Sequence, residues 1–183
     1  MRYNGPTAAV RDQFHQGTNR RAYEMLGAHP VTQDGQEMWH FAVWAPNARA
    51  VSLIGEFNQW DKEKTPMLKV YDGTWEVRLP AETFDVKSDP KRYDYPDAAK
   101  KLTTYKYCIQ AQDGTWQDKA DPYGFAMQMR PDTASRIYDL SGYRWGDADW
   151  MEARKSYDPY HSPVNIYEMH LGSWRRHKDG TFM

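Results

Sequence analysis

FAVWAPNARAVSLIGEFNQWD, the stretch from Phe41 to Asp61, decides how this 183-residue chain is interpreted. Two apolar runs with the alternation of β-strands are followed by a polar turn that contains a single tryptophan, Trp60. A turn of this composition offers no local structural role for its largest aromatic side chain. Trp60 therefore either folds back onto a core or provides a flat surface for a ligand with a flat apolar face, such as a sugar ring.

The composition is that of a folded globular protein, with 40% hydrophobic and 27% charged residues. A net charge of −1 gives no electrostatic reason to expect nucleic acid or an anionic membrane as a partner. The aromatic content of 15% is high and fits either a thick β core or ligand-stacking surfaces. The single cysteine, Cys108, excludes a disulfide framework, favours a cytoplasmic location and is expected to be buried in a strand.

Short strands separated by tight turns dominate the pattern. From Glu37 the period is two, and Trp39, Phe41 and Val43 share one face, which predicts a half-buried strand. Further strands are expected at residues 50–54, 67–71, 74–79, 105–111 and 134–140. This rhythm predicts an all-β fold, an immunoglobulin-like antiparallel β-sandwich.

Three tryptophans lie inside the alternating runs. Trp39, Trp44 and Trp75 are accordingly expected to pack in the core of the sandwich.

Four segments are expected along the chain. They are a lead-in at 1–28 with a short helix near 20–26, the sandwich at 29–140, a linker at 141–162, and a final segment at 163–183. Within the sandwich, residues 84–102 are charged and hold two prolines, which predicts a long excursion with a helical turn at 96–101. In the final segment, Val164–Leu171 predicts one more strand, which either pairs with the sandwich or begins another domain.

No group of residues indicates catalysis. Glu56 and Asp61 flank one turn and are expected to be solvated rather than to act as an acid–base pair. The six histidines lack metal-ligand spacing, and His29 is expected to be a structural loop residue. Phosphate-loop and nucleophile-elbow motifs are absent from the sequence. We therefore predict no catalytic residue, no metal and no cofactor.

Binding is the better-supported role for the turns. Trp60 lies in the first turn, and Trp116 follows the Asp-Gly-Thr of a second turn. Lys106, on the strand that leads to the second turn, is a candidate donor to sugar hydroxyls. From spacing alone, a ligand role and a structural role for either tryptophan both stay open.

Five motifs, in order, carry a family resemblance. They are YEMLGAHP (23–30), FAVWAPNA (41–48), GEFNQWD (55–61), KADPYGFAMQMRPDTAS (119–135) and IYEMHLGSW (166–174). Together they closely resemble the N-terminal region of glycogen (1,4-α-glucan) branching enzymes, which belong to the α-amylase superfamily. The resemblance covers nearly all of residues 20–178.

The resemblance implies a starch- and glycogen-binding module followed by a catalytic (β/α)8 barrel, of which residues 163–183 resemble the start. It implies α-glucan as the partner, stacked on Trp60 and Trp116 with Lys106 nearby, and it gives Asn58 a part in shaping the first turn. Relative to the family, residues of about 85–103 are an insertion close to Lys106. The carboxylates that such a barrel needs for glycosyl transfer fall beyond the resembling region, so none is assigned here.

Three functional interpretations follow. The first is an N-terminal fragment of a branching enzyme that acts as an α-glucan-binding module without a catalytic site. The second is a stand-alone, non-enzymatic glycogen-binding adaptor, which has no need for a barrel strand at Val164–Leu171. The third is an immunoglobulin-like interaction domain for a protein partner, with Trp60 as its hot spot.

Overall fold

The structure is a computed structural model that describes residues 6–70, 73–84, 104–140 and 144–181. It forms two compact units, one within residues 1–143 and one within residues 144–183, and each is described by itself. The excursion and helical turn predicted between residues 84 and 102 lie outside the described residues, apart from Phe84, which is buried.

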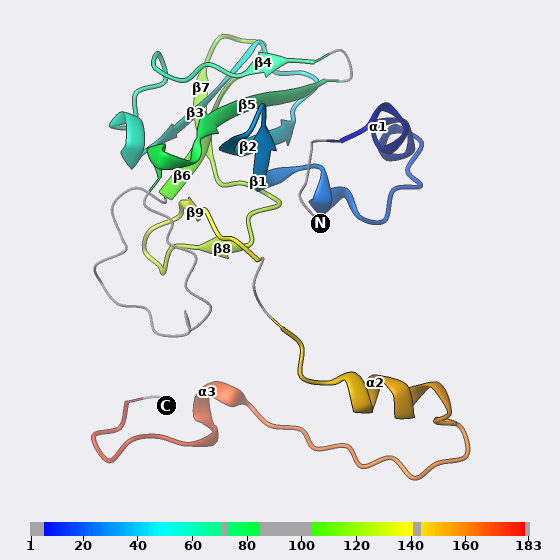
Figure 1. The fold of residues 1–183 in the computed structure, drawn as a ribbon. Helices are drawn as coiled ribbons and strands as arrows, with labels where there is room; N and C mark the ends of the chain where they lie inside the picture. Colours follow the sequence, from blue (N-terminus) through cyan, green and yellow to red (C-terminus); the bar gives the residue numbers. More distant parts are fainter. Residues whose placement is uncertain (1–5, 71–72, 85–103, 141–143, 182–183) are drawn as a thin grey trace. The chain divides into compact units, whose positions relative to one another are not determined.

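Two antiparallel sheets form the first unit (Figure 1). One sheet has the order β1-β2-β5-β4, and the other has the order β3-β6-β9-β8, with β7 paired to β6. The strands are β1 (Gly27–Gln33), β2 (Gln36–Trp44), β3 (Ala50–Gly55), β4 (Leu68–Lys69), β5 (Thr74–Pro80), β6 (Thr104–Gln110), β7 (Trp116–Lys119), β8 (Ala126–Met127) and β9 (Ser135–Arg136). Three short 3-10 helices complete the path, η1 (Ala22–Glu24), η2 (Glu56–Asn58) and η3 (Ala81–Thr83). The predicted mostly antiparallel β fold is confirmed.

One core is shared by the two sheets. Alternation along β2 and β3 turns Phe41 and Leu53 to the same interior, where both are fully buried. Phe41 meets Tyr105 of the other sheet edge to face, with ring centroids 5.1 Å apart. The predicted core positions of Trp39 and Trp75 are confirmed, as is the buried strand position of Cys108.

The outer face of β2 is also covered, so the prediction of a half-buried strand was wrong. His40 and Ala42 alternate with the core residues and yet expose only 0% and 1% of their surface. The cover comes from helix α1 (Ala8–His15) and from the segment that precedes β1, whose apolar residues cluster with Ala42. The members of this second cluster are Val10, Phe14, Met25, Leu26, Ala42 and Tyr123.

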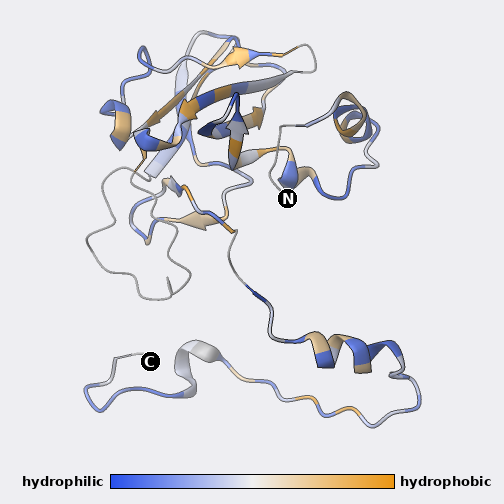
Figure 2. Cartoon of the chain, in the orientation of Figure 1, coloured by the Kyte–Doolittle hydropathy of each residue, from blue (hydrophilic) through white to orange (hydrophobic). Residues whose placement is uncertain are grey.

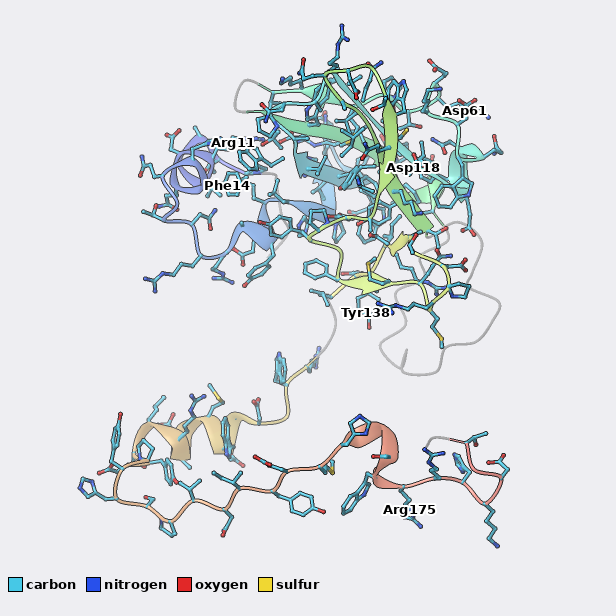
Figure 3. All side chains as sticks on the ribbon, turned by 180° about the vertical axis from the view of Figure 1, so that it is seen from behind. Arg11, Phe14, Asp61, Asp118, Tyr138 and Arg175 are labelled. Carbon is cyan, nitrogen blue, oxygen red and sulfur yellow. The ribbon has the colours of Figure 1, made fainter. Side chains whose placement is uncertain are left out.

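The lead-in therefore belongs to the packed unit. Helix α1 was not predicted, and the short helix expected at 20–26 is only the single 3-10 turn η1. The prediction for Trp44 was also wrong, because Trp44 is 46% exposed and lies outside the core. Its indole instead meets the ring of Phe14 edge to face, with centroids 5.6 Å apart. Phe14 and Arg11 lie on the side of α1 that faces the sheets (Figure 3).

An ionic cluster fixes α1 to the outer face of the first sheet. The Arg11 guanidinium donates a hydrogen bond to the carboxylate of Glu76 on β5. The other Glu76 oxygen lies 3.3 Å from Nε2 of the buried His40. Burial raises the pKa of the Glu76 carboxyl, but the hydrogen bonds and charges of His40 and Arg11 outweigh it, so the pKa lies below its ordinary value.

Glu76→Gln is expected to lower the free energy of unfolding at pH 7 by about 1–2 kcal/mol, because the Arg11 guanidinium loses an ionised acceptor and the opposite charge that pairs with it. A carboxyl whose pKa is depressed by folding stabilises the fold above its unfolded pKa, and that stabilisation is lost as the pH falls through the folded pKa. The difference between the wild type and Glu76→Gln should therefore be smaller at pH 3 than at pH 7 in urea denaturation. Glu82→Gln, at an exposed position, is the control. A difference that is the same at both pH values would contradict the pairing.

The second unit contains α2 (Ala148–Lys155) and the short α3 (Leu171–Trp174). Figure 2 shows hydrophobic and hydrophilic residues mixed along α2, residues of intermediate hydropathy in α3, and a few hydrophobic residues in the segment between them. The guanidinium of Arg154 lies over the Trp150 ring, 5.3 Å from its centroid. The strand predicted at Val164–Leu171 is wrong: residues 164–170 have no regular structure, and the next element is α3. The alternating pattern is that of a strand, but residues 144–181 contain no other strand to pair with it.

The helices in the described ranges are short. Helices α1 and α2 have eight residues each, and none found there is long and apolar enough to cross a membrane.

Candidate functional site

Trp60 is presented to solvent by an uncommon backbone conformation. After η2 the chain passes through two left-handed residues, Gln59 with φ 58° and Trp60 with φ 61°. The Trp60 N–H donates to the Gly55 carbonyl at 2.9 Å, which closes the turn. Left-handed backbone costs a residue with a side chain roughly 1–2 kcal/mol. The turn bears this cost while leaving the Trp60 indole 40% exposed, as residues at binding sites often do.

The buried side chain of Asn58 stabilises this turn through hydrogen bonds. Its amide oxygen accepts from the Gly55 N–H at 3.0 Å, and its NH2 group donates to the Leu53 carbonyl at 2.9 Å and to Thr65 Oγ1 at 3.0 Å. Asn58 is only 5% exposed, so it lies under the turn and not at its surface. Its contribution is to the shape of the turn that carries Trp60.

Asn58→Ala is expected to lower the free energy of unfolding by about 2–4 kcal/mol, because the Gly55 N–H and the Leu53 carbonyl lose a buried partner. Urea denaturation followed by circular dichroism measures the change. Glu63→Ala, in the same turn but with a side chain that is 79% exposed, is the matched control and should stay within about 0.5 kcal/mol. A loss below about 1 kcal/mol for Asn58→Ala would show that the amide does not hold the turn.

Trp116 is the second candidate platform. The tight turn before it is closed by Asp113, whose carboxylate accepts from the N–H of Thr115 at 2.9 Å. Trp116 then begins β7, opposite Gln110 of β6, and is 38% exposed. The ammonium of Lys62, two residues after Trp60, lies over the Trp116 ring at 5.5 Å from its centroid. The turn that carries Trp60 thus reaches the second tryptophan.

Lys106 lies on the same outer sheet face as Gln110, since the two are four residues apart on β6. Because Trp116 pairs with Gln110, Lys106 lies roughly 13 Å along β6 from the residue opposite Trp116. Lys106 pairs with Ile54, so it lies at the end of the sheet where the Trp60 turn begins. Its ammonium donates to Thr133 Oγ1 at 2.9 Å.

The sequence patterns missed Lys62 and Thr133 as members of this surface. The side chain of Lys62 belongs to a charged run, Asp-Lys-Glu-Lys, that is typical of any solvated turn. Only the path of the loop over the sheet brings its ammonium onto an indole. Figure 3 marks Asp61 in this turn and Asp118 on β7.

Cys108 lies in the outer face between Lys106 and Gln110. Burial raises the pKa of its thiol to about 12, a hydrogen bond with Asp118 acts in the same direction, and the charge of Lys62 opposes it. The thiol is therefore protonated at neutral pH and is no nucleophile.

The structure also places three titratable residues that the sequence singled out, His29, Asp61 and Glu56. His29 lies in β1 and not in the predicted loop, and its Nε2 forms a hydrogen bond with the Leu26 carbonyl at 3.0 Å. Burial lowers the pKa of His29. The Asp61 carboxylate accepts from the Glu63 N–H at 2.9 Å, whereas Glu56 is half-buried rather than fully solvated.

A buried carboxylate organises the loop after β7. Asp121 is 4% exposed and accepts hydrogen bonds from the hydroxyls of Tyr105 and Tyr107 at 2.6 and 3.1 Å. The Tyr123 N–H donates to its other oxygen at 2.8 Å. These groups lie in the core, so the cluster supports the sheet that carries Lys106 and Trp116 rather than a reaction.

Residues 25–124 match the profile of carbohydrate-binding module 48, described as the isoamylase N-terminal domain. The chain belongs to this family. The matched range includes both tryptophans of the candidate site, Lys106 and Asn58. Both exposed indoles therefore belong to the module-48 domain.

Relatives of the module-48 chain include 1,4-alpha-glucan branching enzymes GlgB. The enzyme of Thermosynechococcus vestitus is 45% identical over 161 residues, which are 88% of this chain and 19% of that protein. The enzyme of Halothermothrix orenii is 41% identical over 179 residues, 97% of this chain and 26% of that protein. A solved pullulanase from Bacillus acidopullulyticus is 26% identical with a TM-score of 0.42, over 63% of this chain and 12% of that one, too distant to add to the assignment. The chain spans about a fifth to a quarter of the length of these branching enzymes.

Proposed function

We propose that this module binds α-glucan, with Trp60 as the principal stacking platform, Trp116 as a second platform and Lys106 as a donor to sugar hydroxyls. The observation that carries the proposal is the exposed Trp60 indole on a turn that Asn58 holds rigidly in a left-handed conformation. A glucose ring has an apolar C–H face that fits an indole, and its hydroxyls need donors at the rim. The names of the branching-enzyme relatives supply the α-1,4-glucan class.

The wider assignment is part of the same proposal. The module is the N-terminal part of a branching enzyme of glycogen biosynthesis, a cytoplasmic enzyme that transfers α-1,4-linked glucan to a 6-hydroxyl. The fold is an immunoglobulin-like sandwich at residues 29–140, after the lead-in at 1–28, and residues 141–162 link it to the start of a catalytic barrel at 163–183. Support comes from the two sheets around one core and from the relatives, whose similarity extends through most of the chain.

Affinity electrophoresis of the 183-residue chain tests the proposal. Migration should be retarded in gels that contain glycogen or amylose, relative to a gel without polysaccharide and a gel with a β-linked glucan. One or two stacked rings predict a dissociation constant of about 10 μM to 1 mM. Equal mobility in all gels would contradict glucan binding and favour a protein partner for Trp60 instead.

A further inference from the structure

Lys62 lies over the indole of Trp116, the second of the two proposed platforms. Its ammonium lies 5.5 Å from the centroid of the Trp116 ring, within the range of a cation–π contact. The carboxylate of the neighbouring Glu63 lies 3.3 Å from the same ammonium, and the Lys62 side chain is 39% exposed. The lysine is therefore held at the indole and also in contact with water.

Trp60 and Trp116 are consequently unequal platforms. Trp60 lies at the tip of its turn, and its exposed indole has no cation over it among the contacts of the described residues. Trp116 is exposed to a similar fraction but has the Lys62 ammonium over its ring. A sugar ring stacks in van der Waals contact, about 3.5–4.0 Å from the indole plane, and so needs the space that the ammonium occupies.

We propose that Lys62 is a specificity-determining residue of the glucan surface, which covers the Trp116 indole and must leave it before a glucose ring stacks there. The inference rests on the proposed function, because it concerns Trp116 as one of the two proposed stacking platforms. Separating an exposed cation–π pair weakens binding by about two- to five-fold. Ligands long enough to reach both tryptophans bear this penalty, whereas a ligand that stacks on Trp60 alone does not.

Lys62→Met is the appropriate variant, because it keeps the apolar stem of the side chain and removes the ammonium. Lys64→Met is the matched control: it removes the same charge from the same turn, but its ammonium binds the Gln59 side chain and not an indole. Dissociation constants for maltoheptaose are measured by calorimetry in the wild-type and Trp116→Ala backgrounds. Lys62→Met should bind about two- to five-fold more tightly than wild type, and this gain should vanish in the Trp116→Ala background.

The outcomes separate this inference from the proposed function. If the wild type binds maltoheptaose and Lys62→Met binds it with the same or a weaker affinity, only the covering role of Lys62 is overturned. A weaker affinity of Lys62→Met would make Lys62 a donor to the sugar. Absence of binding in the wild type overturns both proposals. Without any ligand, the indole N–H signal of Trp116 in an NMR spectrum should shift in Lys62→Met and stay in place in Lys64→Met. A Trp116 signal that does not respond to Lys62→Met would show that the contact is absent in solution.

Discussion

Asp121→Ala is expected to lower the free energy of unfolding by about 3–5 kcal/mol, because it removes the acceptor from a buried hydrogen-bonded cluster. The hydroxyl of Tyr105 and the N–H of Tyr123 would each lose a partner inside the protein. Tyr107 would keep only its contact with the Ala42 carbonyl, at 3.3 Å, which joins the two sheets. The loss should appear in urea denaturation as a lower midpoint with an unchanged slope.

The ionised form of the buried Asp121 carboxyl reduces the stability that its hydrogen bonds give to the fold. Burial raises the pKa of the carboxyl, and the hydrogen bonds from Tyr105, Tyr123 and Tyr107 only partly oppose it. A raised folded pKa means that the group favours the fold below its unfolded pKa, and that this contribution is lost as the pH rises through the folded pKa. Asp121→Asn removes the charge and keeps one acceptor, so it should cost less than Asp121→Ala at pH 7.

Asp132→Ala, at an exposed position, is the control for the Asp121 variants and should change the free energy of unfolding by at most about 0.5 kcal/mol. If Asp121→Ala lost less than about 1 kcal/mol, the cluster would not hold the loop after β7 in place.

Trp60→Ala is expected to weaken α-glucan binding at least ten-fold, equivalent to about 1.4 kcal/mol. Trp60 is 40% exposed, so its removal leaves no enclosed cavity in the core, and circular dichroism should show that the variant keeps the wild-type fold. The loss is therefore one of contact area with the sugar and not of structure. Retardation in a glycogen gel, quantified against polysaccharide concentration, measures it.

Trp145→Ala is the matched control for Trp60→Ala. Trp145 is 76% exposed, lies in the second unit, and has no place in the proposed site. Its removal should leave the retardation unchanged. A Trp60→Ala variant that keeps its retardation within about two-fold of wild type would show that Trp60 is not the principal platform.

Patterns local to one strand were sufficient to predict β2, β3, β5 and β6. They did not predict β1, β7 and β8, and residues 67–71 and 134–140 form only the two-residue strands β4 and β9. The strands β3, β5 and β6 lie where the alternation of residues 50–54, 74–79 and 105–111 placed them. The covering of β2 depended on contacts that no local pattern carries. Arg11 and Glu76 are 65 residues apart in the sequence, and α1 has only eight residues, too few for a strong helical signal.

The same distinction applies to the site. Turn composition was enough to single out Trp60 and Trp116, which are both exposed in the structure. The contact between Lys62 and Trp116 joins a turn to a strand more than fifty residues later, so only the folded chain reveals it. Val164–Leu171 shows the opposite error, because its alternation resembles a strand although residues 144–181 offer it no partner strand.

An NMR titration of the 183-residue chain with maltoheptaose tests the central proposal most directly, by following the indole N–H signals of Trp60 and Trp116. We expect the Trp60 signal to shift saturably, with a dissociation constant between about 10 μM and 1 mM. The Trp145 signal should stay in place. Saturable binding that leaves the Trp60 signal unmoved would contradict the assignment of Trp60 as the glucan platform.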